Sequence, residues 1–343
     1  MKRKNIVKSI QEKAYQLGYE KCGIIPLDRM DGFEEKFAER IEKIPASQPF
    51  YENQRRLLEF REKYPWAKSV IVLNLPFNHY RVPESLTHRV ARSYLFDNRM
   101  NPQSAEYQSS MAMGEYLQSL GLRVDCNRNF GAVGMRWAAM EAGVGLVRKN
   151  NFLYTESGSW VHLEGFLIDQ ELELIEKTDI PVCPPGCSRC VEACPTRALQ
   201  GPYLLQPMAC ISFLTTFGGR SLTDQTIWKQ FGSCIYGCDI CQEVCPMNKG
   251  KAQGTTDFPG LTELEPLLNP AYILAMTEKE YQEKIQPKFF YLRPDELWKW
   301  QVNVLWFMVN NGVEKYKEVL VAACSHEQEK VRALAQAMCG EFF

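Results

Sequence analysis

The stretch CPPGCSRCVEACPTRAL, residues 183–199, places four cysteines within twelve residues, and the last of the four precedes a proline. A second stretch, CIYGCDICQEVCPMN at residues 234–248, repeats the spacing Cys-x-x-Cys-x-x-x-Cys-Pro. Thiolates at this spacing bind iron–sulfur cubes, and in two-cluster ferredoxins the cysteine before the proline ligates the other cluster. The sequence therefore predicts a ferredoxin-like domain with two [4Fe–4S] clusters. The repeated runs comprise Cys187, Cys190 and Cys194, and then Cys238, Cys241 and Cys245.

Two further cysteines complete two sets of four ligands. Cys183 precedes the first run and Cys210 lies between the runs, whereas Cys234 is a spare thiol beside the second run. Cys183 is the least regular ligand, because three residues separate it from Cys187 where two are usual. We assign one cluster to Cys183, Cys187, Cys190 and Cys245, and the other to Cys194, Cys210, Cys238 and Cys241.

Zinc is the alternative metal for these cysteines. Zinc sites usually show separated pairs of cysteines, whereas this chain has two triplets that each end in Cys-Pro, a pattern that favours iron–sulfur clusters. Disulfides are not expected, because tight cysteine motifs in a cytoplasmic chain are typical of metal ligands. The remaining cysteines read as ordinary buried thiols: Cys22, Cys126, Cys324 and Cys339.

Composition excludes some classes of protein. The 343 residues include 40 basic and 41 acidic side chains, for a net charge of −1, so no overall charge indicates nucleic acid or membrane as a partner. The N-terminus is charged throughout and lacks the apolar core of a signal peptide. No stretch approaches eighteen uncharged apolar residues, so we expect no membrane span and a cytoplasmic location.

The pattern along the chain predicts three parts. Residues 1–178 alternate helical patterns (3–18, 104–120, 131–143) with apolar runs typical of strands (22–27, 69–77, 160–168), which indicates an α/β domain. Residues 179–250 form the two-cluster domain, where metal can replace a large core. Residues 251–343 begin with an expected linker, 251–270, and end in helices from 287 that resemble one or two α-solenoid (HEAT-like) units.

Further segments carry a resemblance to a known family. They are MRWAAMEAGVGLVRKNNFLY (135–154), GSW (158–160), ACISFLTTFGG (209–219), YGCDICQEVCPMN (236–248) and VRALAQAM in the tail. From about residue 65 to its end, the chain resembles the epoxyqueuosine reductases, which are cobalamin-dependent iron–sulfur enzymes distantly similar to reductive dehalogenases. The resemblance implies a cobalamin-binding α/β core, a two-cluster domain and a HEAT-like unit that contacts tRNA.

The resemblance also implies roles for single residues. Lys149, Ser159 and Trp160 match positions beside the corrin ring, and Phe217, Cys238 and Asp239 match corrin-adjacent positions as well. Simpler readings exist, since Lys149 could be a solvated surface lysine and Trp160 a core aromatic. The cobalt-ligating motif Asp-x-His-x-x-Gly is absent, as the family implies, and none of the four histidines fits it.

The substrate side departs from the family. The aspartate that donates a proton in the family aligns with Asn129 of this chain, and an amide cannot act as a general acid near neutral pH. Asp125 could replace it only if the loop shifts by four residues. The family's Asp-Tyr-His segment is replaced by SYLFDNRMNPQS (93–104), where Asp97 is isolated, and the turn glycine before Lys149 is Arg148. These changes predict retained redox machinery with an altered substrate.

Three functions remain open from the sequence. The first is a cobalamin-dependent reductase of the epoxyqueuosine reductase type, supplied by an external electron donor. The second is a non-catalytic electron-transfer protein, and the third is an activator that reduces the corrinoid of a partner. The family implies tRNA as a partner, but residues 251–343 mix both signs of charge and do not support a basic tRNA-binding face.

Overall fold

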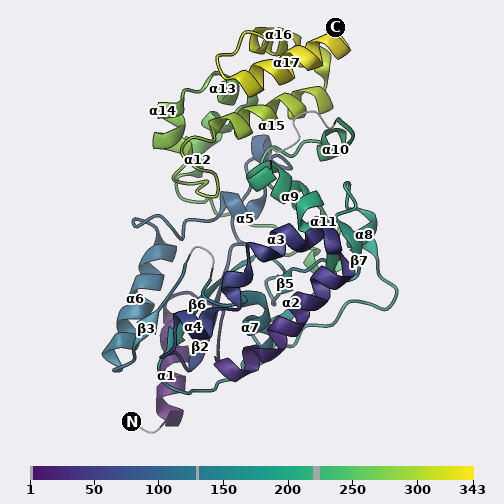
Figure 1. Cartoon of the computed structure of the whole chain (residues 1–343). Coiled ribbons are helices and arrows are strands. Elements are labelled where there is room, and N and C mark those ends of the chain that lie inside the picture. Colours follow the sequence, from purple (N-terminus) through teal and green to yellow (C-terminus); the bar gives the residue numbers. More distant parts are fainter. Residues whose placement is uncertain (1–2, 129–130, 219–224) are drawn as a thin grey trace.

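The computed structural model describes residues 3–128, 131–218 and 225–343, and it stacks three regions along one axis (Figure 1). The α/β region lies at the N-terminal end, the cysteine-rich region in the middle, and a helical region at the C-terminal end. The mixed α/β architecture agrees with the predicted fold class. In the described residues, no helix has the length and apolar character needed to cross a membrane.

A four-stranded antiparallel sheet organises the N-terminal region, in the order β1-β2-β6-β3. Its long strands β1 (Lys21–Pro26), β2 (Ser69–Pro76) and β6 (Val161–Ile168) fall on the three predicted runs. The edge strand β3 (Val124–Asp125) has only two residues and pairs with the C-terminal end of β6. Two small hairpins lie outside this sheet: β4 (Leu146–Val147) with β5 (Leu153–Tyr154), and β7 (Leu199–Gly201) with β8 (Leu204–Leu205).

Alternation along the strands explains the two layers of helices. On β1, Cys22 and Ile24 face one core while Ile25 faces the other, as expected for side chains with a period of two. Helices α1 (Arg3–Gln16) and α6 (Ala105–Ser119) pack on the first side, and α7 (Met135–Glu141) packs on the second. The predicted helices therefore exist, although α7 is shorter than expected.

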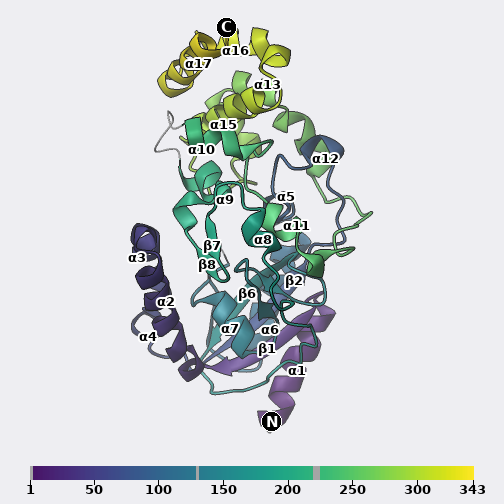
Figure 2. The same cartoon turned by 90° about the vertical axis from the view of Figure 1, so that its right-hand side faces the viewer.

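Residues 31–63 form an arm beside the α/β region (Figure 2). It consists of α2 (Asp31–Lys43), α3 (Gln48–Glu52) and α4 (Phe60–Lys63). In the middle region the helices are short: α5 (Arg92–Leu95), α8 (Arg189–Glu192), α9 (Ile211–Phe213), α10 (Gln225–Trp228) and α11 (Ile240–Glu243).

The C-terminal helices share one core with the middle region. They are α12 (Leu261–Leu264), α13 (Pro270–Ala275), α14 (Glu278–Glu280), α15 (Leu297–Asn310), α16 (Lys317–Ala323) and α17 (Glu329–Phe342). The expected linker at 251–270 contributes buried Phe258, Leu261 and Leu268 to this core, so its C-terminal half is packed rather than free. The HEAT-like character of the tail remains a prediction.

Asn303 of α15 joins the helical region to the middle region. Its buried side-chain amide donates to the carbonyls of Thr215 and Ile235, at 2.9 Å each. Thr215 lies directly before Thr216 and Phe217, which line a cavity beside the predicted ligands. Ile235 lies three residues before the predicted ligand Cys238. These two hydrogen bonds therefore fix the cysteine-rich region against helix α15.

We predict that Asn303→Ala lowers the free energy of unfolding by about 1–3 kcal/mol, because it leaves buried carbonyls without a donor. Chemical denaturation of the metal-free protein measures this change. Asn53→Ala is the control, since the exposed Asn53 side chain donates only to the carbonyl of Pro49 and its loss is expected to cost less than about 0.5 kcal/mol. Equal effects of the two substitutions would contradict the bracing role.

Candidate functional site

The two cysteine runs form two similar one-turn structures that face each other. Cys190 lies on α8 and Cys241 on α11, and these two helices are in contact. A glycine with positive φ precedes the first cysteine of each run, Gly186 at 69° and Gly237 at 81°. A Cβ on Gly237 would come within 2.6 Å of the Tyr94 ring and of Ala91, so both the backbone angle and the space favour glycine there.

Four of the predicted ligands surround a small hollow. Cys183, Cys187, Cys190 and Cys245 line a cavity of about 20 Å³. Burial raises the pKa of Cys190, and the neighbouring thiols of Cys245 and Cys183 raise it further. Cys245 thus lies with the first run although it belongs to the second.

The other four predicted ligands lie on one wall of a larger cavity, which we call the second cavity. This cavity of about 240 Å³ is lined by Cys194, Cys210, Cys238 and Cys241 together with aromatic side chains. Burial and the nearby Cys238 raise the pKa of Cys210 to about 11. Burial, followed by Cys238 and Cys210, also raises the pKa of Cys241. Cys194 lies with the second run, so the exchange between the two runs is reciprocal.

The cysteines surround hollows and do not converge on one point. Within the described ranges, no three or more His, Cys, Asp or Glu side chains are grouped so that they could hold a single metal ion. A cube of four irons and four sulfides spreads its four thiolate ligands more widely than a tetrahedral zinc does. The spare Cys234 is buried and contacts Cys238, which leaves it near the second group.

Basic side chains border the first hollow. Lys149 donates from Nζ to the carbonyl of Cys187 at 2.8 Å, and Arg148 Nη1 lies 3.8 Å from the sulfur of Cys183. Arg148 is 2% exposed, and its position beside a cysteine was not anticipated from the sequence, where it appeared only as a departure from a glycine. Both residues therefore lie at the first cysteine group, and the predicted contact of Lys149 with a corrin stays a prediction.

Of the other predicted cofactor residues, Phe217 lines the second cavity, and the rest are packed inside the protein. Ser159 is buried and donates to Gln242, and Trp160 is 1% exposed in the core against Phe77. Phe217, by contrast, is 43% exposed and lines the second cavity. Asp239 accepts the backbone N–H of Arg92 at 2.8 Å, and burial raises its pKa to about 7. Their roles at a corrin remain predictions.

Asn129 and Asp125 are the two candidate proton donors. Asn129 lies outside the described residues. Asp125 is on β3 opposite Leu167, six residues along β6 from Val161. Since a strand rises about 3.3 Å per residue, Asp125 is about 20 Å along the sheet from the end that meets the cysteine-rich region.

Asp97, which appeared isolated in the sequence, belongs to a buried polar cluster. Arg99 binds its carboxylate with two hydrogen bonds of 2.8 and 2.9 Å, and Lys288 donates to its backbone carbonyl at 2.8 Å. Burial would raise the pKa of Asp97, but Arg99 holds it well below its usual range. Burial lowers the pKa of Lys288 to about 7 and that of His162 to about 4. No local pattern indicates this cluster, because Lys288 comes from 191 residues away.

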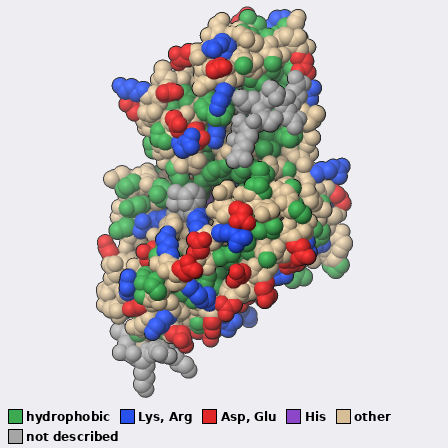
Figure 3. All heavy atoms as spheres, viewed as in Figure 1, with side chains coloured by type: hydrophobic (Ala, Val, Ile, Leu, Met, Phe, Trp, Pro, Cys, Tyr) green, Lys and Arg blue, Asp and Glu red, His purple; other side chains and the backbone are tan. Residues whose placement is uncertain are grey.

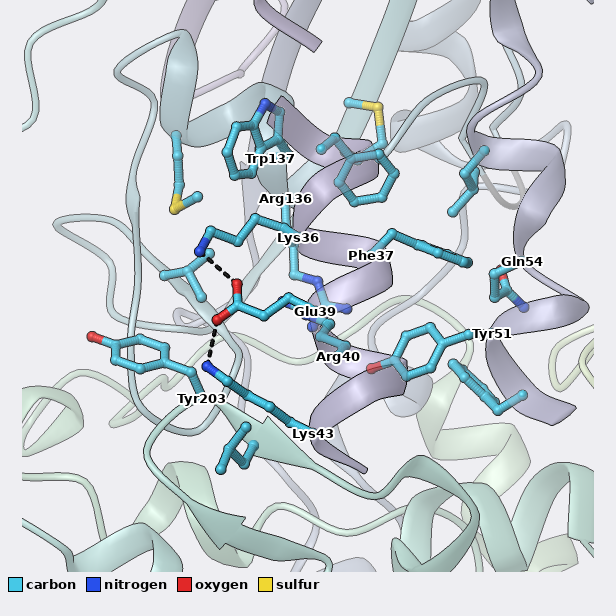
Figure 4. A pocket seen from close by; sticks show the side chains of 18 of the residues that line it. Lys36, Phe37, Glu39, Arg40, Lys43, Tyr51, Gln54, Arg136, Trp137 and Tyr203 are labelled. Carbon is cyan, nitrogen blue, oxygen red and sulfur yellow. Dashed lines mark hydrogen bonds and ion pairs between the residues drawn. The ribbon is translucent and has the colours of Figure 1, made fainter. Parts of the chain in front are cut away.

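A large cleft separates the arm from the body of the protein (Figure 4). It has a volume of about 680 Å³, and its walls come from α2, α3, α7 and the β7–β8 turn. Phe50 and Arg136 line both this cleft and the second cavity, so the two spaces adjoin. The cleft thus leads toward the second cysteine group, a connection that the sequence did not indicate.

Residues 183–248 match the family model of a 4Fe-4S double cluster binding domain. The epoxyqueuosine reductase of Prochlorococcus marinus is 32% identical over 171 residues, and that of Cellulophaga algicola is 28% identical over 285 residues. The first alignment covers 49% of this chain and 53% of the relative, and the second covers 80% and 87%.

In sequence and in fold, the chain resembles the epoxyqueuosine reductases. A crystal structure of an epoxyqueuosine reductase with an epoxyqueuosine-modified tRNA-Tyr stem loop matches with a TM-score of 0.76 at 22% identity, over 97% of this chain and 89% of that one. The Streptococcus thermophilus epoxyqueuosine reductase matches with a TM-score of 0.72 over 98% and 99%. The sequence alignment with the Prochlorococcus marinus enzyme spans about half of that relative's length. The structural matches, in contrast, cover nearly the whole of this chain.

We predict that Asp97→Asn lowers the free energy of unfolding by about 3–5 kcal/mol, because it leaves the buried Arg99 without its counter-charge. Asp257→Asn is the matched control, since Asp257 pairs with Arg81 in an exposed ion pair that is worth at most about 1 kcal/mol. Urea denaturation of both variants measures the difference. A loss below about 1 kcal/mol for Asp97→Asn would contradict the buried cluster.

Proposed function

We propose that the chain is a two-cluster iron–sulfur oxidoreductase that uses a corrinoid and acts on an epoxyqueuosine-like substrate. The observation that carries this proposal is the opening of the second cysteine group into a cavity that adjoins a cleft of about 680 Å³. A protein that only carries electrons needs no such space beside its clusters. The two electron-transfer alternatives are therefore less well supported than an enzyme.

The eight cysteines would hold the two clusters in crossed sets. Cys183, Cys187, Cys190 and Cys245 are the proposed ligands of the first cluster, and Cys194, Cys210, Cys238 and Cys241 those of the second. Support comes from the two hollows that these sets line and from the match to a double cluster binding domain. Because the thiol pKa values of Cys210 and Cys241 are raised, cluster assembly must displace their protons.

The residues of the second cavity and the cleft fit a corrinoid. Among the described residues that line these two spaces there is no histidine, so a corrinoid bound here would have no protein imidazole on cobalt. Asn151 lines the second cavity, and its buried Nδ2 has no hydrogen-bond partner within the described structure, which leaves a donor for an amide-rich ligand. When bound, the group would supply a cobalt centre that low-potential electrons reduce to a nucleophile.

The chain itself would orient the substrate and supply a proton. Tyr94 lines the second cavity, its hydroxyl lies 3.0 Å from that of Ser212, and burial raises its pKa, so its oxygen keeps a proton at neutral pH. Phe217 presents an exposed ring on the same wall. We propose that these two side chains border the reacting carbon, with Tyr94 as a proton holder in the cavity wall.

A tRNA substrate is proposed on weaker grounds. One structural relative was solved with a modified tRNA stem loop. On the face in Figure 3, however, Lys and Arg side chains are interspersed with Asp and Glu, and no broad basic area appears there. Binding of tRNA would then depend on few phosphate contacts and fall only modestly with salt.

We predict that cysteine variants pair across the two runs. Cys194→Ala and Cys241→Ala should abolish the electron paramagnetic resonance signal of the same cluster, while Cys245→Ala and Cys187→Ala abolish that of the other. Each variant should keep about four of about eight iron atoms after anaerobic reconstitution. Cys22→Ala, a buried thiol away from both groups, is the control and should keep both signals. A Cys194→Ala variant that loses the same signal as Cys187→Ala would disprove the crossing.

We also predict weak or absent reduction of epoxyqueuosine-containing tRNA by the unmodified protein. The aligned donor is Asn129, and the loss of a positioned general acid costs a factor of roughly 10²–10⁴ in rate. Asn129→Asp should raise the rate, measured with a strong reductant and added cobalamin, and Tyr94→Phe should lower any residual rate. Rapid turnover that Asp125→Asn abolishes would show instead that Asp125 is the donor and that the family activity is retained.

A further inference from the structure

The turn of the β4–β5 hairpin meets the cysteine-rich region with three consecutive side chains. Arg148 reaches the sulfur of Cys183, while Lys149 and Asn150 donate to backbone carbonyls of two further cysteine residues. Arg148 is the one of the three that is both charged and buried, since 2% of it is exposed. It stands where the resembled family has a glycine, so the family resemblance gives no role to its side chain.

The buried guanidinium of Arg148 has no carboxylate beside it in the described parts of the chain. Its Nη2 donates to the carbonyl of Pro181, its Nη1 lies 3.8 Å from the sulfur of Cys183, and its central carbon lies 4.9 Å from the centre of the Tyr154 ring. No described group accepts a hydrogen bond from its Nε. A buried charge is costly unless an opposite charge joins it, so we expect an anion beside this guanidinium.

The Tyr154 ring connects Arg148 to a second proposed ligand. Burial raises the pKa of Tyr154, so its hydroxyl keeps its proton, and this hydroxyl lies within hydrogen-bonding range of the Cys245 sulfur. Asn150 donates to the same hydroxyl oxygen at 2.9 Å, which agrees with an O–H directed toward that sulfur. Arg148 and Tyr154 therefore adjoin two sulfurs that are proposed to bind one cluster, those of Cys183 and Cys245.

We propose that Arg148 is a positioning residue of the first cluster, which holds Cys183 in place as a ligand and supplies a positive charge that makes this cluster easier to reduce. The inference rests on the proposed function, because it assigns a role beside one of the proposed clusters. A guanidinium carries its donors in a rigid fork, so one group can hold the Pro181 carbonyl and also face the sulfur two residues later. The chain is thereby fixed just where three residues, instead of the usual two, separate Cys183 from Cys187.

The charge of Arg148 acts on reduction because one electron adds one negative charge to a cluster that is already anionic. The reduction potential of such a cluster depends on its net charge, on hydrogen bonds to its sulfurs and on its exposure to solvent. A cation held beside a sulfur stabilises the more negative, reduced form more than the oxidised form, and burial protects this interaction from screening by salt. No bond forms or breaks in this step, and the electron comes from an external one-electron donor such as dithionite.

The test measures the midpoint potential of each cluster by electron paramagnetic resonance of the anaerobically reconstituted protein, poised with dithionite and redox dyes. The signal of the first cluster is the one that Cys187→Ala removes. In Arg148→Met, the ratio of reduced to oxidised first cluster at a fixed potential should fall roughly 10-fold, the size expected for the loss of one charge-assisted hydrogen bond. For one electron this corresponds to a midpoint about 59 mV lower. The second cluster should keep its midpoint, since Arg148 does not line the second cavity.

Two further variants separate the charge of Arg148 from its position. Arg148→Lys keeps the charge, so its first-cluster midpoint should lie closer to that of the unmodified protein than to that of Arg148→Met. Arg189→Met removes an exposed arginine from the wall of the same hollow, and solvent should limit its effect on the ratio to less than about 2-fold. Exposure to an iron chelator tests the position of Cys183: Arg148→Met should lose the iron of its first cluster faster than Arg189→Met.

An unchanged first-cluster midpoint in Arg148→Met, or equal shifts of both clusters, would overturn the inference and leave the proposed function standing. A midpoint in Arg148→Lys as low as that in Arg148→Met would overturn it as well. If Arg148→Met retains only the second cluster, retention of the first cluster by Arg148→Lys supports the inference, and its loss from both variants contradicts a role for the charge. Unmodified protein that assembles neither cluster would overturn the proposed function itself.

Discussion

The rest of the structure depends on the exchange of cysteines between the two runs. Cys194 leaves the first run to join the second group, and Cys245 leaves the second run to join the first. A proline follows each of them, and its fixed φ directs the chain away at that point. Because each cysteine group contains side chains from both runs, residues 183–248 form one unit. The contact between α8 and α11 is the structural result.

The surroundings of this unit differ on its two sides. Arg148, Lys149 and Arg189 border the first group. The second group faces an apolar cavity with Tyr94 and Phe217, and Asn303 braces its segment from the C-terminal helices. The second group therefore lies beside the larger cavity, whereas the first group has only the small hollow. The arm completes that site, since its Phe50 lies where the cleft and the cavity meet.

The features that could be predicted from the sequence are those that depend on residues close together in the chain. The two-cluster domain was predicted because six of its cysteines recur at a short, repeated spacing, and the family match over residues 183–248 supports it. The strands at 69–77 and 160–168 were predicted because continuous apolar runs stand out. The assignment of the eight single ligands stays a prediction. The buried Asp97 cluster was missed, because Arg99 is a neighbour in sequence but Lys288 and His162 arrive only through tertiary structure. The cleft was missed for the same reason. Cys324 and Cys339, expected as buried thiols, are half-buried with sulfurs 3.2 Å apart, since α16 and α17 pack together.

Iron-edge anomalous diffraction from anaerobically reconstituted crystals would locate both clusters and their ligands. We expect two separate iron clusters, one bound by Cys183, Cys187, Cys190 and Cys245 and the other by Cys194, Cys210, Cys238 and Cys241. A single cluster, a zinc signal in place of iron, or two clusters each bound within its own run would disprove the crossed assignment.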